Sequence, residues 1–213
     1  MSPNRALLAL LRSHGDAPPL DRAVALIAAD EQPGLVPEDV IAQLDQLAAG
    51  LRLPPLCEPV QTVARLHHHL FVELGFRGDE EDYDAPRNSF LDQVLTRRRG
   101  LPILLSVVYV EVAKRRGLAV DPVGFPGHFL VSPRIEPRIW VDSFRGGEIL
   151  RAPELRRQLA QAGLGDRADE LLGPVTTRQI LQRMTHNLLR TYEALGDSAG
   201  VARSLARLAL LGG

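Results

Sequence analysis

Apolar residues recur at helical spacing through the first third of the chain. The pattern predicts helices over residues 6–50, with a break at Pro33-Gly34, and another helix over residues 59–74. Asp21 follows two prolines and is expected to cap the helix that comes after it. The apolar run at the start gives way to polar residues too early for a signal peptide, so we expect an amphipathic first helix.

The last quarter of the chain is again helical in pattern. Two amphipathic helices are predicted at residues 179–192 and 199–211, on either side of Gly196-Asp197. Two helices around such a turn are typical of one helix–turn–helix repeat. A single unit of this kind cannot bury both of its faces, so it must dock on the preceding domain or on a partner.

Between these helical regions the pattern changes to one apolar helix followed by short strands. Residues 103–116 are apolar on nearly every side, which predicts a helix buried on all faces, and Pro102 suits its first position. The first strand contains Pro122 and is expected at an edge, and the next two form an antiparallel hairpin. The strands are expected at residues 119–125, 128–132 and 138–142.

We therefore expect an α+β fold in which a small antiparallel sheet packs against a buried central helix. N-terminal helices and a C-terminal helix pair flank this core. Three regions are expected: an N-terminal helical region at 1–58, the core at 59–152, and the C-terminal helices with one repeat-like unit at 153–213.

The composition limits the kinds of partner and the cellular location that we expect for this chain. The chain has 213 residues, 45% of them hydrophobic and 24% charged, as in an ordinary soluble globular protein. Its net charge of −1 gives no reason to expect nucleic acid, and no stretch approaches the ~20 apolar residues of a membrane span. A single cysteine, Cys57, excludes an internal disulfide and fits a cytoplasmic location. Nearly all basic residues are Arg. This excess reflects either a GC-rich genome or an Arg-lined surface that binds carboxylates or phosphates.

Two segments suggest a metal at first sight, and neither has the right pattern. Residues 67–69 are all His, but successive helical side chains point about 100° apart and cannot converge on one ion. The acidic loop at residues 79–84 lacks the ligand spacing of a calcium loop. We expect no metal and no cofactor.

A His, an Asp and a helix start together suggest nucleophilic chemistry. His128 and Asp142 lie 14 residues apart on segments predicted to adjoin in the hairpin, facing the start of the central helix. A papain-like site would place a thiol there, where the helix dipole lowers its pKa. The His would take the thiol proton and the Asp would hold the imidazole in the right tautomer.

The chain resembles the transglutaminase-like superfamily, and within it the bacterial SirB-type proteins, which carry C-terminal tetratricopeptide repeats. The resemblance extends from about residue 25 to residue 210 and implies a transglutaminase-like, papain-like core. The motifs that carry it are Glu73-Leu74-Gly75-Phe76-Arg77-Gly78, Asn88-Ser89-Phe90-Leu91, Val94-Leu95-Thr96-Arg97-Arg98, Gly100-Leu101-Pro102-Ile103, Pro126-Gly127-His128-Phe129-Leu130-Val131, Val141-Asp142-Ser143-Phe144 and Gly146-Gly147.

The resemblance implies a missing nucleophile. In active transglutaminase-like domains the helix begins Gly-x-Cys, and the Cys position falls on Pro102, as it does in the SirB-type group. Pro has no nucleophilic atom, so the Cys mechanism is unavailable. Cys57 lies in a Pro-rich linker and is expected to be a small buried residue. Ser106, one turn into the helix, is either a replacement nucleophile or a residue that packs in the core or bonds back to the carbonyl of Pro102.

The remaining candidates for the site have two interpretations each. Asn88 and Ser89 either cap a short helix at residues 90–95 or line a pocket. Gly127 lies beside the His, and Trp140 is either core or a platform for a ligand.

Two functions follow. The first is a catalytically degenerate protein that acts in interaction or regulation, with a protein partner at the C-terminal helices. The second is a hydrolase or amidase that uses His128 and Asp142 with a nucleophile other than Cys. The longer family members carry further repeats beyond the one predicted here, so a groove built from repeats is not expected.

Overall fold

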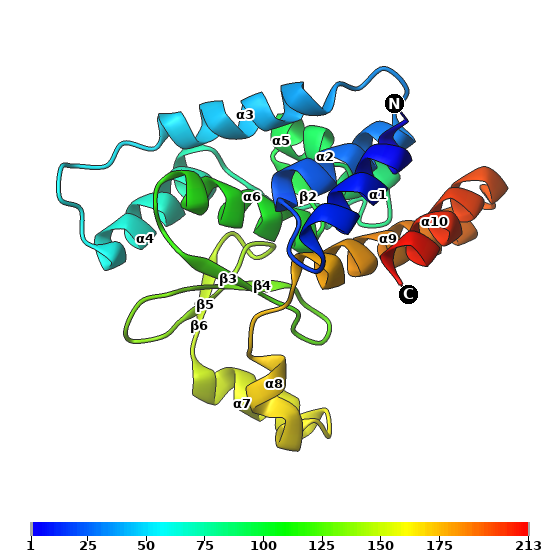
Figure 1. The fold of residues 1–213 in the computed structure, drawn as a ribbon. Coiled ribbons are helices and arrows are strands. Elements are labelled where there is room, and N and C mark those ends of the chain that lie inside the picture. The colour runs from blue at the N-terminus through cyan, green and yellow to red at the C-terminus, as the bar shows by residue number, and fades with distance from the viewer. Residues whose placement is uncertain (1, 213) are drawn as a thin grey trace.

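The structure, a computed structural model, describes residues 2–212 and has the expected α+β fold (Figure 1). Its α-helices are α1 (Pro3–His14), α2 (Leu20–Glu31), α3 (Pro37–Gly50), α4 (Pro59–His67), α5 (Leu91–Arg97), α6 (Pro102–Arg115), α7 (Ala152–Gln161), α8 (Ala168–Leu171), α9 (Thr177–Leu195) and α10 (Ser198–Leu211). The strands are β1 (Arg77–Gly78), β2 (Arg99–Gly100), β3 (Val120–Val123), β4 (Leu130–Pro133), β5 (Trp140–Asp142) and β6 (Glu148–Leu150). Single turns of 3₁₀-helix are η2 (Pro86–Ser89) and η3 (Gly165–Arg167), and α4 continues into a π-helix, η1 (His68–Glu73).

The sheet agrees with the prediction. Its four strands run antiparallel in the order β3-β4-β5-β6, so β3, which contains Pro122, lies at an edge. Strands β4 and β5 form the expected hairpin, with Val131 opposite Val141. β1 and β2 form a separate parallel pair beside the start of α6.

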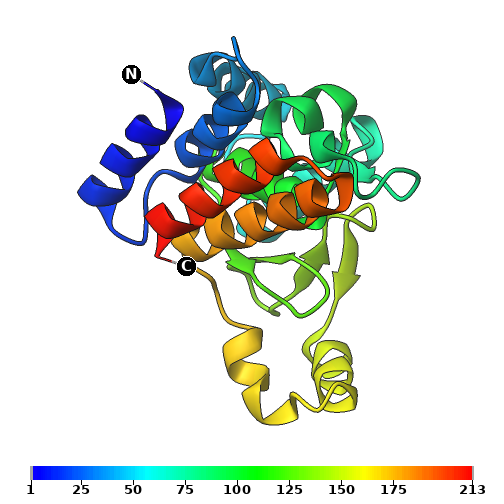
Figure 2. The ribbon, with the colours of Figure 1, turned by 90° about the vertical axis from the view of Figure 1, so that its right-hand side faces the viewer.

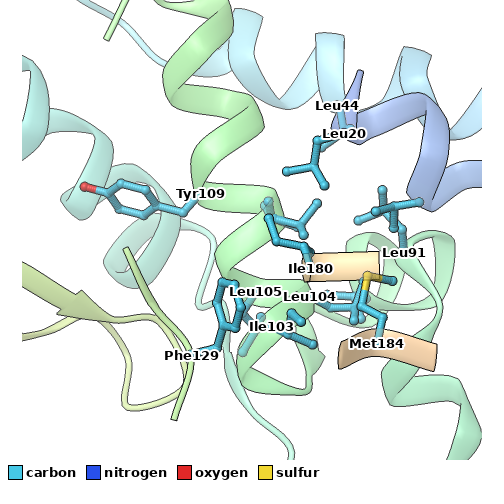
Figure 3. Close-up of a cluster of buried hydrophobic side chains, with 14 of the residues drawn as sticks. Leu20, Leu44, Leu91, Ile103, Leu104, Leu105, Tyr109, Phe129, Ile180 and Met184 are labelled. Atoms are coloured by element: carbon cyan, nitrogen blue, oxygen red, sulfur yellow. The ribbon is translucent and has the colours of Figure 1, made fainter. Parts of the chain in front are cut away.

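Helix α6 is the centre of the main core. Leucines from α2, α3 and α5, Phe129 from the segment before β4, and Ile180 and Met184 from α9 meet around it (Figure 3). The cluster reaches from Leu7 in α1 to Leu211 in α10. Its buried side chains therefore come from all three predicted regions, and the boundaries at 58/59 and 152/153 stay predictions.

The two faces of the sheet pack on different partners. Val131 and Val141 belong to the main core, whereas Leu130 and Trp140, their neighbours along the strands, belong to a second cluster. This alternation follows from the two-residue period of a strand. The second cluster is completed by Leu155, Leu159, Ala168 and Leu172, so α7 and α8 cover the outer face of the sheet (Figures 1 and 2).

The C-terminal helix pair docks on the domain that precedes it. Helix α9 begins with a capping box between Thr176 and Gln179 and ends at Gly196 in the left-handed conformation. In α10, the fully buried guanidinium of Arg207 bonds to Asp30 and Glu31 of α2, at 2.7 Å each. The pair lies alongside α2 in both views (Figures 1 and 2).

The predicted cap at Asp21 is wrong. Helix α2 begins one residue earlier, after Pro19, and has no side-chain cap. The Asp21 carboxylate instead accepts a hydrogen bond from Arg115 at the end of α6, at 2.7 Å. The Asp21 carboxylate therefore forms a long-range ion pair instead of a helix cap.

Candidate functional site

The start of α6 is fixed by a proline and by the segments behind it. Pro102 is the first helical residue, as predicted, and Leu101 before it is extended. The backbone N–H of Leu101 donates to the carbonyl of Asn88 at 3.1 Å. Gly100 is required here, because a Cβ atom would come within 2.5 Å of the Val94 side chain. The helix therefore begins at one defined place.

Asn88 and Ser89 lie behind this helix start, both buried. Neither caps α5, whose N-terminal flanking residue is Phe90 without a side-chain cap, so the capping prediction is wrong. The Asn88 amide instead donates to the carbonyl of Asp82 at 2.6 Å and accepts from Arg97 at 2.8 Å. Asn88 thus ties the acidic loop to the residues that set the start of α6.

His128 and Asp142 form the expected pair. The Nδ1 atom of His128 lies 3.0 Å from Oδ2 of Asp142. His128 is not in a strand as predicted; it follows the Gly127 turn and precedes β4 by two residues. Asp142 is the last residue of β5, and its Oδ1 accepts the backbone N–H groups of Phe144 and Arg145, at 3.0 and 3.3 Å.

The two side chains of this pair differ in solvent exposure: the carboxylate is buried and the imidazole ring is partly exposed. The Asp142 side chain is 1% exposed, and that of His128 is 33% exposed. A carboxylate can only accept, so it fixes the proton of the neutral imidazole on Nδ1 and leaves Nε2 as the acceptor. Within residues 2–212, Nε2 makes no hydrogen bond. The arrangement can take up a proton at Nε2 or bind a donor there.

Ser106 does not replace the missing thiol. It is fully buried in α6, and its Oγ donates to the carbonyl of Phe129 at 3.1 Å. Ser106 is therefore packed, as one alternative predicted; the other alternative, a bond to the carbonyl of Pro102, is wrong, because the hydroxyl donates to a longer-range acceptor. Ser106 joins α6 to the segment that carries His128.

Trp140 is core rather than a platform for a ligand. It is buried in the second cluster, behind the sheet, and the guanidinium of Arg138 lies 4.8 Å from the centre of its ring. Its side chain faces α7 and α8, away from the main core.

A cavity of about 750 Å³ opens beside the helix start. One wall consists of Pro102 and Ile103, with Gly127 and Phe129 from the two sides of His128. Tyr83 from the acidic loop also contributes. The structure therefore brings Pro102 and Gly127 together at the cavity. His128 lies next to it in the chain, between the lining residues Gly127 and Phe129, but is not itself a lining residue, and neither are Asp142, Asn88, Ser89, Ser106 and Trp140. The opposite wall is formed by Gln179, Gln182, Arg183, His186, Asn187 and Arg190.

This opposite wall is one face of α9, which no motif predicted. Its residues follow the spacing of 3, 1, 3, 1 and 3 that marks a single helical stripe, and that spacing is the signal in the sequence that identifies them. Arg183 donates to the carbonyl of His128 at 2.6 Å and to that of Phe125 at 3.3 Å. Burial lowers the pKa of its guanidinium below the usual value. Helix α9 thus both encloses the cavity and holds the His128 loop.

The three successive histidines at residues 67–69 do not converge on one point, as expected. His69 is buried and contacts Glu73 at 2.7 Å and the carbonyl of Leu47 at 3.2 Å, whereas the side chain of His68 is 57% exposed. His67 packs edge-on against Phe71. Among residues 2–212, no three His, Cys, Asp or Glu side chains gather in an arrangement that suits a metal ion. In that same part of the chain, no helix is both long and apolar enough to cross a bilayer.

Comparison with known protein families decides the ancestry of this site. The family model described as the transglutaminase-like superfamily matches residues 38–186, from α3 into α9. The chain belongs to the transglutaminase-like superfamily. Pro102, His128 and Asp142 all lie within the matched region, so the site belongs to the family's own domain.

Curated relatives of this superfamily member come from bacteria and animals. A UPF0162 protein of Xylella fastidiosa (strain Temecula1) is 38% identical over 188 residues, which cover 82% of this chain and 65% of that protein. A UPF0162 protein of Pseudomonas aeruginosa is 29% identical over the whole chain, which covers 78% of that protein. The F-box only protein 21 of Mus musculus is 33% identical over 153 residues, 68% of this chain and 23% of that protein. The chain thus spans just under two thirds of the length of the Xylella relative. No solved structure matches it.

Proposed function

We propose that this transglutaminase-like chain is catalytically degenerate, is of the SirB type, and acts in protein interaction or regulation by binding a segment of a partner protein beside His128. The observation that carries the proposal is Pro102 at the first position of α6, where a nucleophile would have to stand. His128 and Asp142 keep the geometry that would serve such a nucleophile.

Neighbouring residues do not supply the missing group. The hydroxyl of Ser106 is buried and donates to a carbonyl. Cys57 is a half-buried residue of the linker between α3 and α4, and it does not line the cavity.

The cavity supports the binding role. Its volume of about 750 Å³ lies in the range of ligand pockets, roughly 300–1,000 Å³. The apolar face of α9 packs in the main core through Ile180, Met184 and Leu188. Its polar face is therefore the surface that remains for a partner. The C-terminal helices then contribute to binding through this wall of the cavity.

Blocking the cavity tests the proposal. His186 is exposed on the α9 wall, and His186→Trp would fill the opening with an indole ring. Gln158→Trp, on the exposed side of α7, introduces the same ring away from the cavity and is the matched control. Affinity capture with the full chain, followed by quantitative mass spectrometry, should find partners that are retained by the control and lost with His186→Trp. Partners retained equally by both variants would refute binding in the cavity.

Deletion of residues 177–213 is not a usable alternative. Helix α9 places Ile180, Leu181, Met184 and Leu188 in the main core. Each such side chain contributes about 1.5–3 kcal/mol through burial, so the remaining chain would lose a large part of its stability.

One observation favours a second candidate, a hydrolase or amidase. The His128 ring is one-third exposed, is held by a buried carboxylate, and has its Nε2 free to accept a proton. Water activated at Nε2 would then take the place of the thiol. Hydrolysis of a library of peptide and amide substrates by the wild type, lost in His128→Ala, would establish this candidate. No turnover, or turnover that survives His128→Ala, would exclude it.

A further inference from the structure

The cavity beside His128 is lined by cationic and neutral side chains. Arg183, His186 and Arg190 line it from α9, and no Asp or Glu contributes to the lining within residues 2–212. The whole chain has 25 basic and 26 acidic residues, so this separation of charge is local. We propose that the cavity binds the carboxylates of an acidic segment of a partner protein, an inference that rests on the proposed function of the same site.

The other arginines of helices α9 and α10 are all paired with carboxylates of the chain. Arg178, Arg203 and Arg207 each lie within 4.0 Å of a carboxylate. In the described part of the chain, neither Arg183 nor Arg190 forms such an ion pair, although both lie on the same helix as Arg178. The charges of Arg183 and Arg190 are therefore available to an anionic ligand.

Arg183 provides a positive charge in the wall of the cavity, held in place by backbone carbonyls. Its two terminal nitrogens donate to the carbonyls of Phe125 and His128, and its guanidinium carbon lies 5.4 Å from the centre of the Phe129 ring. Carbonyl groups satisfy hydrogen bonds but do not neutralise the charge of this partly buried guanidinium, whose desolvation is costly until a counter-charge arrives. An anion in the cavity would supply that counter-charge.

Arg190 provides a second charge at the exposed rim. One of its nitrogens donates to Oδ1 of Asn187 at 2.6 Å, which leaves the other donors for a ligand. An adjoining hollow of about 290 Å³, which Arg190 also lines, contains one carboxylate, that of the exposed Asp84; among residues 2–212 no ion pair joins it to Arg190. Two arginines on one wall, seven residues apart, can contact carboxylates at successive points of an extended segment.

The rest of the lining favours a peptide over a small free anion. The side-chain amides of Gln179, Gln182 and Asn187 each use one atom in a hydrogen bond within the chain, and the other atom can bond to the peptide groups of a ligand. Ile103 and Phe129 add apolar contact. The first turn of α6 also faces the cavity, and the positive end of the helix dipole favours negative charge there.

Charge reversal at the rim tests the inference. Arg190→Glu leaves the Arg183 contacts untouched, and Arg157→Glu makes the same change of charge at an exposed position on α7. The probe is an acetylated octapeptide of alternating Ala and Glu, compared with the same peptide carrying Gln and with inorganic phosphate. Binding is followed by the amide chemical shifts of ¹⁵N-labelled full-length protein.

The expected result is a saturable shift of amides in residues 127–129 and 179–190 with the Glu peptide. Affinity should fall at least about tenfold with Arg190→Glu, remain unchanged with Arg157→Glu, and weaken with added salt. Equal binding of the Gln peptide, or equal loss in both variants, would overturn the preference for carboxylates and leave partner binding in the cavity standing. Saturation of the same amides by phosphate at matched concentration would show a general anion site and overturn the assignment to a peptide. Shifts that never reach the cavity would also overturn the inference, whereas failure of the proposed function is read separately from the His186→Trp capture.

Discussion

Arg207 offers a direct test of whether the C-terminal helices are part of the domain. Its side chain is 0% exposed and bonds to Asp30 and Glu31, whose side chains are 13% and 0% exposed. Arg207→Ala would leave the Asp30 carboxylate without its ion pair and would leave buried Glu31 with only Arg203 and the Tyr192 hydroxyl. Breaking a buried ion pair in this way costs about 3–5 kcal/mol. Two nitrogens of Arg207, Nε and Nη1, are buried without a hydrogen bond, so the ion pair is incompletely compensated and the lower half of the range is expected.

The measurement is thermal unfolding followed by circular dichroism at neutral pH. For a chain of this size, 1 kcal/mol corresponds to about 2–4 °C, so a loss of about 3–4 kcal/mol lowers the Tm by roughly 6–16 °C. Arg203→Ala is the matched control, because Arg203 bonds to the same Glu31 but is 37% exposed and should cost about 0–1 kcal/mol. Combining Arg207→Met with Asp30→Asn and Glu31→Gln should recover much of the loss. Equal effects of Arg207→Ala and Arg203→Ala would refute the reasoning.

Three further predictions concern the site and its support. Pro102→Cys should place a thiol with a pKa below about 7.5 at the start of α6, and adding His128→Ala should move that pKa back towards ~8.5, as read from the pH dependence of alkylation by iodoacetamide; an unshifted thiol would show that the inherited geometry is lost. Asp79 is buried, which raises its pKa, but the Arg97 guanidinium more than offsets this and holds the pKa below its usual 3.8. Asp79→Asn should therefore cost about 2 kcal/mol at neutral pH, and the difference from the wild type in urea unfolding should shrink as the pH falls below about 3.8; a difference that does not depend on pH would contradict the ion pair. Ser106→Ala should destabilise by about 1–3 kcal/mol, because its carbonyl acceptor loses its donor, without changing any turnover that His128→Ala abolishes; loss of turnover with full stability would restore Ser106 as a nucleophile.

Local patterns in the sequence predicted much of the frame of this site. Pro102 marks the helix start because proline suits the first helical turn, and Pro122 places its strand at an edge because it cannot donate to the ladder. The pairing of His128 with Asp142 followed from the hairpin and the family motifs. The helical unit at the end was expected to dock, and it does.

Long-range partners were beyond those patterns. Ser106 bonds to a residue 23 positions away and Asp21 to one 94 positions away, so local rules assigned both to nearer partners. The α9 wall was missed for a related reason. Helical periodicity shows that one face of α9 is buried, but only the tertiary fold shows that its other face meets Pro102 and Gly127 across a cavity.

The two-sided sheet has a consequence for how chains of this superfamily can vary. Between β6 and α9 the chain makes an excursion across the outer face of the sheet through α7 and α8, and it returns where the N–H of Val175 bonds to the carbonyl of Pro122. Both ends are anchored on strands, and the packing along the way uses the second cluster rather than the main core. Because closing a longer loop between fixed ends adds little entropic cost, residues can be inserted or lost here while the cavity on the opposite side keeps its shape. Differences in length among relatives should therefore gather in this excursion.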